Sequence, residues 1–275
     1  DAMAPAFQPG KRVLIIGGGY IGLEAAAVAS KLGLQVTLVE MADRILQRVA
    51  APQTSDYFRA LHQVHGVDIR EGVGLDRLLG DDHVTGAILT DGTELDIDFA
   101  VVGVGITPAT ILAESAGVAV ENGITTDGHG RTSDPHIWAA GDCASCLFHG
   151  QTIRLESVGN AIDQAEAVAM NIASGDQPYV PKPWFWSDQY NLGLQMVGLS
   201  LGVTQSTIRR LPNEAILHFG VNEQGGLLSA CGIGLGNAVA KDIKLAERII
   251  NQGVSVSIDE LSDPSISLKH LLKTK

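Results

Sequence analysis

The sequence predicts an α/β fold: a Rossmann-like domain with an inserted β-hairpin, then a connecting segment and a C-terminal α+β domain. Three observations support this prediction. Apolar strands alternate with helices from Arg12 to Val104, and a glycine-rich turn joins the first strand to the first helix. Past residue 178 the pattern changes to aromatic residues and consecutive strands.

The first half of the Rossmann-like domain has the order strand, helix, strand. Arg12–Ile16 is a continuous apolar strand, as expected at the centre of a parallel sheet. An Ala-rich helix, Leu23–Leu32, ends at Gly33, and Gln35–Glu40 forms the second strand. We therefore expect a βαβ unit at this point of the chain.

The second half of that domain adds a helix, a strand and a hairpin. Pro52–His65 is predicted as a helix with proline in its first turn, and Val67–Arg70 as a short strand. Val84–Leu89 and Thr93–Ile97 flank the dipeptide Asp91-Gly92, which is a strong hairpin turn signal. The order of these elements predicts an α/β domain up to residue 101.

The segment that follows mixes short strands with helices. Phe99–Val104 reads as a buried strand, and Ile111–Ala116 as a short helix. Ile124–Thr126 and Ile137–Ala140 are predicted as short strands in a turn-rich stretch, and Asn160–Ala173 as an Ala-rich helix.

The C-terminal domain, residues 179–275, begins with a cluster of aromatic residues. These are Tyr179, Trp184, Phe185, Trp186 and Tyr190. Taken alone, such a cluster is typical of core, although it is also suited to a flat aromatic ligand. The predicted elements that follow are the strands Thr207–Leu211, Ala215–Val221 and Leu227–Ile233, the helix Asn237–Asn251, and a short helix at the end.

Composition excludes several classes of protein. The chain has 275 residues, of which 45% are hydrophobic, so it can bury sizeable cores. A net charge of −12 argues against a nucleic-acid-binding protein, which needs basic patches to neutralise phosphates. No apolar run is long enough to predict a membrane span. Three cysteines do not make a disulfide framework, and they favour a reducing, cytoplasmic setting.

The glycine-rich turn contains the fingerprint Gly17-x-Gly19-x-x-Gly22 between a strand and a helix, which is typical of dinucleotide binding. The first glycine permits the turn, the second lets the backbone approach a pyrophosphate, and the third lets helix and strand pack closely. Glu40, at the end of the second strand, can accept hydrogen bonds from ribose hydroxyls and repel the extra phosphate of NADP, which predicts NAD(H). Arg44 keeps NADP as an alternative ligand, because an arginine soon after the second strand can bind its extra phosphate. A surface or adenine-covering role is favoured for this residue.

Five segments resemble one known family. Gly17–Ala26 (GGGYIGLEAA) and Val101–Thr110 (VVGVGITPAT) resemble two glycine motifs of the two-dinucleotide, glutathione-reductase-like flavoprotein reductases. Thr132–Asp142 (TSDPHIWAAGD) resembles their motif in which an aspartate reaches FAD. Two further segments are similar to the branch of NADH-dependent ferredoxin and rubredoxin reductases that supply oxygenases and cytochrome P450s. They are Arg154–Ser157 together with Asn160 and Ala161, and Trp184–Gln189 (WFWSDQ).

The resemblance implies three parts. These are an NAD(H)-binding domain at 1–101, the second segment of a FAD-binding domain at 102–178, and a C-terminal α+β reductase domain at 179–275. In this family a first FAD-binding segment with its own glycine fingerprint precedes these parts. We expect this chain to lack that segment, so that the FAD site is only partly encoded here.

The resemblance also implies the mechanism: NADH passes hydride to FAD, and electrons leave singly to a small iron–sulfur partner, a ferredoxin or rubredoxin. Glu24 resembles the family glutamate near the nicotinamide, and Asp142 the aspartate at the flavin's ribityl–pyrophosphate region. The implied catalytic residues are Glu24, Glu156, Trp184 and Trp186. The implied cofactor-binding residues are Gly17, Gly18, Gly19, Tyr20, Ile21, Gly22, Glu40, Arg44, Gly103, Gly105, Asp142 and Val158. No metal site is predicted.

Two smaller signals leave alternatives open. Cys143 and Cys146 form a CxxC that fits either a redox disulfide or the start of a helix rich in small residues. Lys241, Lys244 and Arg248 share one face of a predicted helix, which is either a solvated face or a docking patch for an acidic ferredoxin.

Three functions therefore compete. The first is an NADH-dependent flavin reductase of an electron-transfer chain. The second is a truncated NAD-binding module without flavin or activity, and the third is a flavin disulfide reductase that uses the cysteine pair. The scattered histidines, including His62 and His65, are expected to be solvated or core residues.

Overall fold

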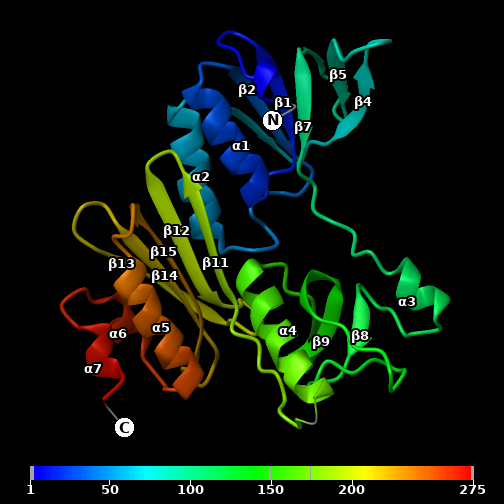
Figure 1. Cartoon of the computed structure of the whole chain (residues 1–275). Helices are drawn as coiled ribbons and strands as arrows, with labels where there is room; N and C mark the ends of the chain where they lie inside the picture. Colours follow the sequence, from blue (N-terminus) through cyan, green and yellow to red (C-terminus); the bar gives the residue numbers. More distant parts are fainter. Residues whose placement is uncertain (1–2, 149, 174, 274–275) are drawn as a thin grey trace. The chain divides into compact units, whose positions relative to one another are not determined.

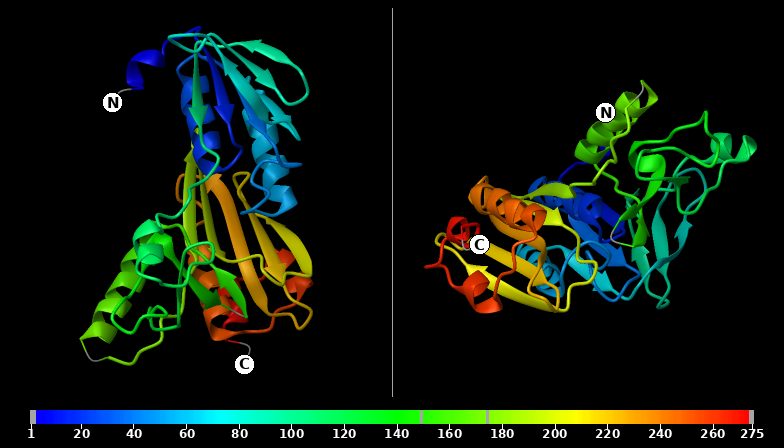
Figure 2. Two further views of the ribbon diagram at one scale, coloured as in Figure 1. Left: turned by 90° about the vertical axis from the view of Figure 1, so that its right-hand side faces the viewer. Right: turned by 90° about the horizontal axis from the view of Figure 1, so that it is seen from below.

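A computed structural model describes residues 3–148, 150–173 and 175–273. Residues 1–2 and 274–275, at the ends of the first and last predicted domains, lie outside the described residues. The chain divides into two compact units, which Figures 1 and 2 show in colours that follow the sequence. The first unit comprises Asp1–Gly105 and Trp186–Lys275, and the second comprises Ile106–Phe185.

The first unit contains a four-stranded parallel sheet with the order β3-β2-β1-β7. The strands are β1 (Arg12–Ile16), β2 (Gln35–Glu40), β3 (Asp68–Glu71) and β7 (Phe99–Val102). Helix α1 (Tyr20–Lys31) packs on β1 and β2, and α2 (Pro52–Val64) packs on β3. A short 3-10 helix, η1 (Ala4–Ala6), precedes β1. The predicted βαβ unit is therefore confirmed, with its helix beginning at Tyr20 rather than at Leu23.

A three-stranded antiparallel sheet is inserted before β7. It consists of β4 (Leu75–Leu79), β5 (Gly86–Leu89) and β6 (Glu94–Asp96) in sequence order. The predicted hairpin is β5–β6, and β4 is an addition that the sequence pattern did not reveal. Apolar residues of this sheet pack on the parallel sheet in one cluster, formed by Leu14, Ile16, Val39, Ala87, Leu89 and Ile97.

The C-terminal domain is built on a five-stranded antiparallel sheet with the order β11-β12-β15-β14-β13. Three of these strands were predicted: β13 (Gln205–Arg210), β14 (Ile216–Val221) and β15 (Leu227–Leu235). The strands β11 (Trp184–Gln189) and β12 (Leu192–Gly198) were not predicted. Three helices follow, namely α5 (Ala240–Gln252), α6 (Ile258–Ser262) and α7 (Leu268–Leu271).

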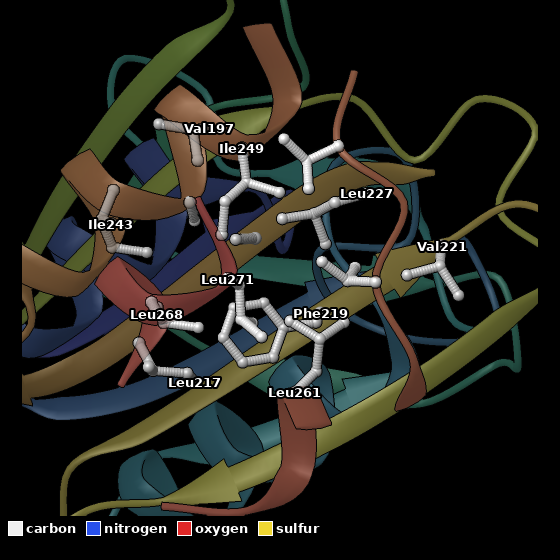
Figure 3. Packing of buried hydrophobic residues seen from close by; sticks show 14 of the residues in the cluster. Val197, Leu217, Phe219, Val221, Leu227, Ile243, Ile249, Leu261, Leu268 and Leu271 are labelled. Atoms are coloured by element: carbon white, nitrogen blue, oxygen red, sulfur yellow. The ribbon is translucent and has the colours of Figure 1, made fainter. Parts of the chain in front are cut away.

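The core of this domain lies between the sheet and the three helices (Figure 3). Helix α5 buries Ile243, Ala246 and Ile249, which recur every three residues and so share one helix face. They meet Leu217 and Phe219 of β14 in one cluster. Full burial of each large aliphatic side chain contributes about 1.5–3 kcal/mol, so this core can hold the sheet rigidly.

The second unit contains α3 (Ile111–Ser115), a three-stranded sheet and α4 (Val158–Ile172). In the sheet, β9 (Ala144–Phe148) pairs in parallel with β8 (Ile124–Thr126) and antiparallel with β10 (Gln151–Ile153). A 3-10 turn, η2 (Gly141–Cys143), leads into β9.

Two predictions for this unit were wrong. Ile137–Ala140 is not a strand, because only Trp138 makes an isolated bridge, with Arg131. The Cys143–Cys146 segment is not the start of a helix. It is a 3-10 turn that runs into β9, because Ala144, Ser145 and Cys146 pair with β8 and their backbone groups are used by the sheet.

Every helix in the described part of the chain is too short or too polar to cross a bilayer.

Candidate functional site

The glycine turn between β1 and α1 is closed by backbone contacts that exclude any side chain. Gly17 has φ of 106°, and a Cβ atom there would lie 2.4 Å from the carbonyl oxygen of Gly103. A Cβ at Gly22 would lie 2.0 Å from the carbonyl oxygen of Gly17. The first and third glycines therefore allow β1, α1 and the end of β7 to approach each other closely.

Gly19 differs from its neighbours, because a Cβ there would meet nothing within 4 Å. It is the N-cap of α1 and, being glycine, it has no side chain that could cap the first N–H groups of the helix. A helix N-terminus of this kind carries partial positive charge and binds pyrophosphate. The turn therefore fits a dinucleotide, with the space at Gly19 as the place where the phosphates would approach.

Glu40 at the end of β2 holds the glycine turn. Its Oε2 accepts a hydrogen bond from the Gly18 N–H at 2.7 Å, and its Oε1 accepts one from the Ala42 N–H at 2.8 Å. A carboxylate has further lone pairs, so these bonds leave capacity for ribose hydroxyls. Glu40 thus also orients the glycine turn. This second role was not evident from its position in the sequence.

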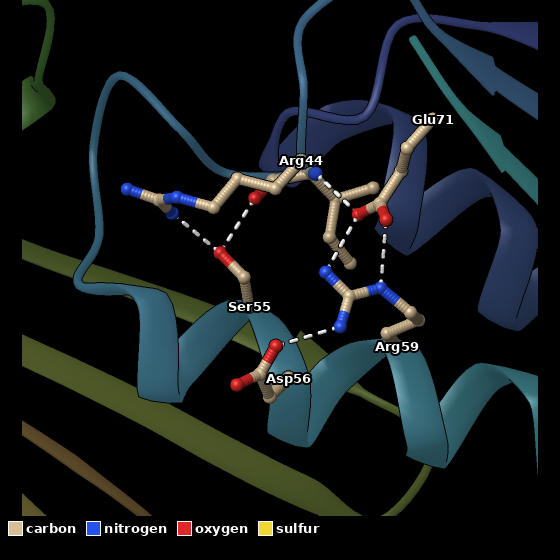
Figure 4. A network of polar contacts seen from close by, with 6 residues as sticks. Arg44, Ser55, Asp56, Arg59 and Glu71 are labelled. Atoms are coloured by element: carbon tan, nitrogen blue, oxygen red, sulfur yellow. Dashed lines mark hydrogen bonds and ion pairs between the residues drawn. The ribbon is translucent and has the colours of Figure 1, made fainter.

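Arg44 lies in a network of polar contacts in the loop after β2 (Figure 4). Its Nη1 donates to the hydroxyl of Ser55 at 2.6 Å, and its Nη2 donates to the carbonyl of Gln47 at 3.2 Å. Two of its N–H groups are therefore bound to protein groups, which fits the predicted surface role better than recognition of an NADP phosphate.

The same network fixes the start of this loop through Arg59 of α2. Arg59 donates two hydrogen bonds to Glu71 and one to Asp56, and these carboxylates raise the pKa of Arg59 (Figure 4). Glu71 also accepts the Ile45 N–H at 2.8 Å. The loop that borders the glycine turn is thus tied to both α2 and β3.

The second glycine motif lies at the end of β7, beside the first. Gly103 faces Gly17, and Gly105 has φ of 99°. The guanidinium of Arg48 is 3.2 Å from the position of a Cβ on Gly105. Arg48 is an exposed cation at this edge of the sheet. Sequence reasoning missed it, although its place after β2, close to Arg44, was an available signal.

Tyr20 and Ile21 open α1 in different environments. Ile21 is exposed, whereas the Tyr20 hydroxyl donates to the sulfur of Met196 on β12 at 2.8 Å. Burial raises the pKa of Tyr20 above its ordinary value, so the phenol stays protonated. Tyr20 therefore links the glycine turn to the C-terminal sheet.

Glu24 of α1 receives a hydrogen bond from the buried Ser187 of β11. The distance from Ser187 Oγ to Glu24 Oε1 is 2.6 Å. Ser187 in turn accepts from the Gln189 amide at 3.1 Å, and Gln189 Oε1 lies 2.8 Å from His62 Nε2. Sequence reasoning treated His62 as a solvated or core residue and did not single out Ser187 or Gln189.

Trp184 and Trp186 lie on one face of β11. Strand alternation leaves them 40% and 43% exposed, while Ser187 and Gln189 on the other face are buried. The aromatic run is therefore not plain core. It presents two indole rings on the face opposite the Glu24 contact.

In the second unit, two residues of the predicted flavin site, Asp142 and Glu156, contact Arg154. Its Nη1 donates to the main-chain carbonyl of Asp142 at 3.1 Å and pairs with Glu156 Oε1 at 2.6 Å. Arg154 Nε is buried with no hydrogen-bond partner among the described residues. Val158 is 63% exposed at the first position of α4, and Ser157 caps that helix. An exposed Asp142 carboxylate and an unpartnered buried donor fit a polar cofactor.

Comparison with known proteins decides the family. Residues 1–165 match the model of the pyridine nucleotide-disulphide oxidoreductases, and residues 184–272 match the reductase C-terminal domain. The chain belongs to the pyridine nucleotide-disulphide oxidoreductase family. The combination of a pyridine nucleotide with FAD, predicted from the sequence, is the one that this family uses.

Curated relatives of this chain include a ferredoxin reductase subunit and a putidaredoxin reductase. The ferredoxin reductase subunit of 5,5'-dehydrodivanillate O-demethylase from Sphingobium is 40% identical over 98% of this chain and 66% of its own length. Putidaredoxin reductase from Pseudomonas putida is 38% identical over 95% of this chain and 62% of its own length. The chain thus spans between 62% and 66% of the length of these two relatives.

Solved structures of family members match the fold closely. The reductase–putidaredoxin covalent complex gives a TM-score of 0.91 at 35% identity, and covers 98% of this chain and 66% of that chain. A ferredoxin reductase from Rhodopseudomonas palustris gives 0.90 at 38% identity, with the same coverage. The predicted fold class is therefore confirmed.

The family name directs attention to the two cysteines of the second unit. Both are free: Cys143 lies in the 3-10 turn with its sulfur 3.5 Å from the Ala140 carbonyl oxygen, and Cys146 lies within β9. Burial raises the pKa of the Cys146 thiol, which disfavours the reactive thiolate. This environment fits a structural thiol better than a redox pair.

The three cations of α5 are all exposed. Lys241, Lys244 and Arg248 lie away from Ile243 and the other residues that α5 buries in its core. They form one basic face on a chain whose net charge is −12. We call this set the α5 basic face.

Proposed function

We propose that this chain is the electron-input part of an NADH-dependent flavoprotein reductase. Electrons would pass from NADH through FAD to a ferredoxin or rubredoxin that serves an oxygenase or a cytochrome P450. The observation that carries the proposal is the glycine turn, in which two close backbone approaches, at Gly17 and Gly22, and the Glu40 carboxylate leave open space only at Gly19. The names of the relatives support the acceptor.

The nucleotide part of the proposal rests on residues of the first unit. Gly17, Gly19 and Gly22 shape the turn, and the N-terminus of α1 binds the pyrophosphate. Glu40 accepts hydrogen bonds from the ribose hydroxyls and from the Gly18 N–H. Its charge repels the extra phosphate of NADPH. Arg48 provides a cation near the second glycine motif, Gly103 and Gly105.

The flavin part of the proposal rests on the second unit and β11. FAD, when bound, accepts a hydride and releases electrons one at a time. Asp142 and the N-terminus of α4 at Val158 would bind its polar chain. Glu156, Trp184 or Trp186 would lie near its ring, and Glu24 would lie near the nicotinamide. We assign 1–101 to NAD(H), 102–178 to part of the FAD site and 179–275 to the reductase domain.

The partner part of the proposal rests on charge. Three exposed cations on one helix attract an acidic iron–sulfur protein and speed its encounter with the reductase. A relative in this family is solved in complex with putidaredoxin. We place the reaction in the cytoplasm, since the chain carries free thiols and needs a supply of NADH.

The proposal is tested with purified protein, NADH, added FAD and a [2Fe–2S] ferredoxin, while the ferredoxin absorbance is followed under nitrogen. We expect NADH-dependent reduction that requires FAD. Binding of NADH without any FAD-dependent electron transfer would favour the alternative function, an NAD-binding module.

A further inference from the structure

The contact between Glu24 and Ser187 joins the two family domains of the chain. Glu24 belongs to the match over residues 1–165, and Ser187 to the match over residues 184–272. The hydroxyl donates to Glu24 Oε1 at 2.6 Å, and Ser187 is 1% exposed. Hydrogen bonds of this length to a carboxylate belong to the strong, charge-assisted class.

A chain of buried donors holds Ser187 in this orientation. Because the hydroxyl of Ser187 donates to Glu24, it accepts from the amide N–H of Gln189, and the Gln189 oxygen then faces His62 as an acceptor. His62 must donate from Nε2, which leaves Nδ1 to accept from the Tyr190 hydroxyl at 3.0 Å. Burial lowers the pKa of His62 and raises that of Tyr190 to about 12, which agrees with this order.

Every hydrogen bond in this series, from Tyr190 to Ser187, is donated in the direction of the Glu24 carboxylate. The orientation of Glu24 is therefore set by residues of the C-terminal domain. Glu24 is half-buried, and its second oxygen, Oε2, accepts no hydrogen bond from the described residues. A fixed carboxylate oxygen of this kind accepts an N–H from a carboxamide and repels another carboxylate.

We propose that Ser187 is a positioning residue that orients Glu24 to read the carboxamide of the nicotinamide ring. The inference rests on the proposed function, since it takes from it both the glycine turn as the site of NAD(H) and the place of Glu24 near the nicotinamide. It goes beyond that function because it makes the C-terminal domain part of nucleotide recognition. Glu24 is then the group that touches the ligand, and Ser187 acts through it.

A second buried hydroxyl provides a matched control. Thr54 of α2 lies with its Oγ1 at 2.7 Å from Nδ1 of His218 on β14, so it also links the nucleotide domain to the C-terminal sheet. The hydrogen bonds of Thr54 go to His218 and Cys231 and not to Glu24. Ser187→Ala and Thr54→Val each remove one hydroxyl from this contact region, but only the first releases the carboxylate.

The experiment compares the affinity of the purified chain for NAD⁺ and for nicotinic acid adenine dinucleotide, in which a carboxylate replaces the carboxamide. Isothermal titration calorimetry gives both dissociation constants without any need for flavin. We expect wild type and Thr54→Val to prefer NAD⁺, and Glu24→Gln to lose the preference. Ser187→Ala should lower it about tenfold, as expected for one hydrogen bond to a charged group.

Thermal unfolding of each variant separates loss of recognition from loss of structure. The inference is overturned if Ser187→Ala keeps the wild-type preference, if it loses no more than Thr54→Val, or if Glu24→Gln still discriminates. In those outcomes NAD⁺ binding survives and the proposed function stands. If wild type binds neither nucleotide, the proposed function itself is wrong.

Discussion

The glycine turn of the first unit and the Asp142 region of the second unit differ in how completely neighbouring protein groups pack against them and satisfy their hydrogen-bonding groups. Around Gly17 and Gly22, backbone contacts and the Glu40 carboxylate complete the turn from within. Around Asp142, the Nε of Arg154 is buried without a partner among the described residues. Other elements of that unit expose apolar side chains, with Leu112 of α3 84% exposed and Val158 of α4 63% exposed.

This difference indicates that the two regions have different requirements for binding a cofactor. The glycine turn is closed by its own backbone and needs only the ligand, whereas a unit that has exposed apolar side chains and an unpaired buried donor needs further cover. We therefore expect nucleotide binding and flavin binding to separate experimentally. NADH should bind to the first unit with no dependence on the state of the second.

Substitutions of the glycines are expected to have the largest effects on the first unit. Gly22→Ala places a Cβ 2.0 Å from the Gly17 carbonyl oxygen, and overpacking of this kind costs about 3 kcal/mol or more. Gly19→Ala meets nothing within 4 Å, so it should leave the melting temperature unchanged. It should nevertheless weaken NADH binding at least tenfold, about 1.4 kcal/mol, because the added methyl occupies the space for the phosphates.

Calorimetric melting and NADH titration of both variants test this pair. If Gly19→Ala keeps full affinity, the open space at that position is not where the phosphates lie, and the account of the turn is wrong.

The contact between α2 and the C-terminal sheet predicts a pH dependence of stability within the first unit. Burial lowers the pKa of His218 to about 4, whereas an unfolded histidine titrates near 6.5. Between these values the unfolded chain binds the proton and the folded chain does not, so stability falls as pH falls. The loss from pH 7 to pH 4 amounts to about 3 kcal/mol from this residue.

Urea unfolding at several pH values measures the slope. His218→Gln removes the titrating group and should flatten the slope, although His62, whose pKa burial also lowers, contributes a part. An unchanged slope in this variant would show that His218 is not the source.

The α5 basic face predicts a kinetic effect of moderate size. Substitution of Lys241, Lys244 and Arg248 by glutamine should slow ferredoxin association about tenfold at low salt and reduce its salt dependence. A matched control replaces three other exposed lysines, Lys31, Lys182 and Lys269, with the same change in net charge. Stopped-flow mixing measures the association rate. Equal slowing in both triple variants would assign the effect to net charge rather than to a docking face.

The smallest effect is expected at the cysteines. Cys143→Ser with Cys146→Ser should leave NADH oxidation unchanged, because Cys146 is held as a thiol by burial and Cys143 lies in a tight turn. Loss of NADH-dependent electron transfer in this double variant would restore the disulfide-reductase hypothesis.

Local signals predicted the nucleotide turn well, because strand, glycine spacing and helix follow one another within a short segment. The strands β4 and β11 were missed for different physical reasons. In β4, the exposed Asp76 and Arg77 interrupt the alternation that marks a half-buried strand. In β11, polar residues occupy the buried face, and Ser187 and Gln189 are buried only because Glu24 and His62 satisfy them.

Long-range contacts were beyond prediction from a single sequence. The residues next to Glu40 in the sequence do not indicate that it accepts a hydrogen bond from Gly18. The residues next to Ser187 do not indicate that it donates one to Glu24. The Cys143–Cys146 segment read as the start of a helix because its residues are small. Its strand pairing with β8 depends on residues that lie far away along the chain.

The central claim, that the closed glycine turn with Glu40 is a site for NADH, is tested most directly by titration of the purified chain with NADH and with NADPH. We expect NADH to bind at least tenfold more tightly, and Glu40→Gln to weaken NADH and abolish the preference. Equal affinity of wild type for the two nucleotides, or no binding of either, would contradict the account.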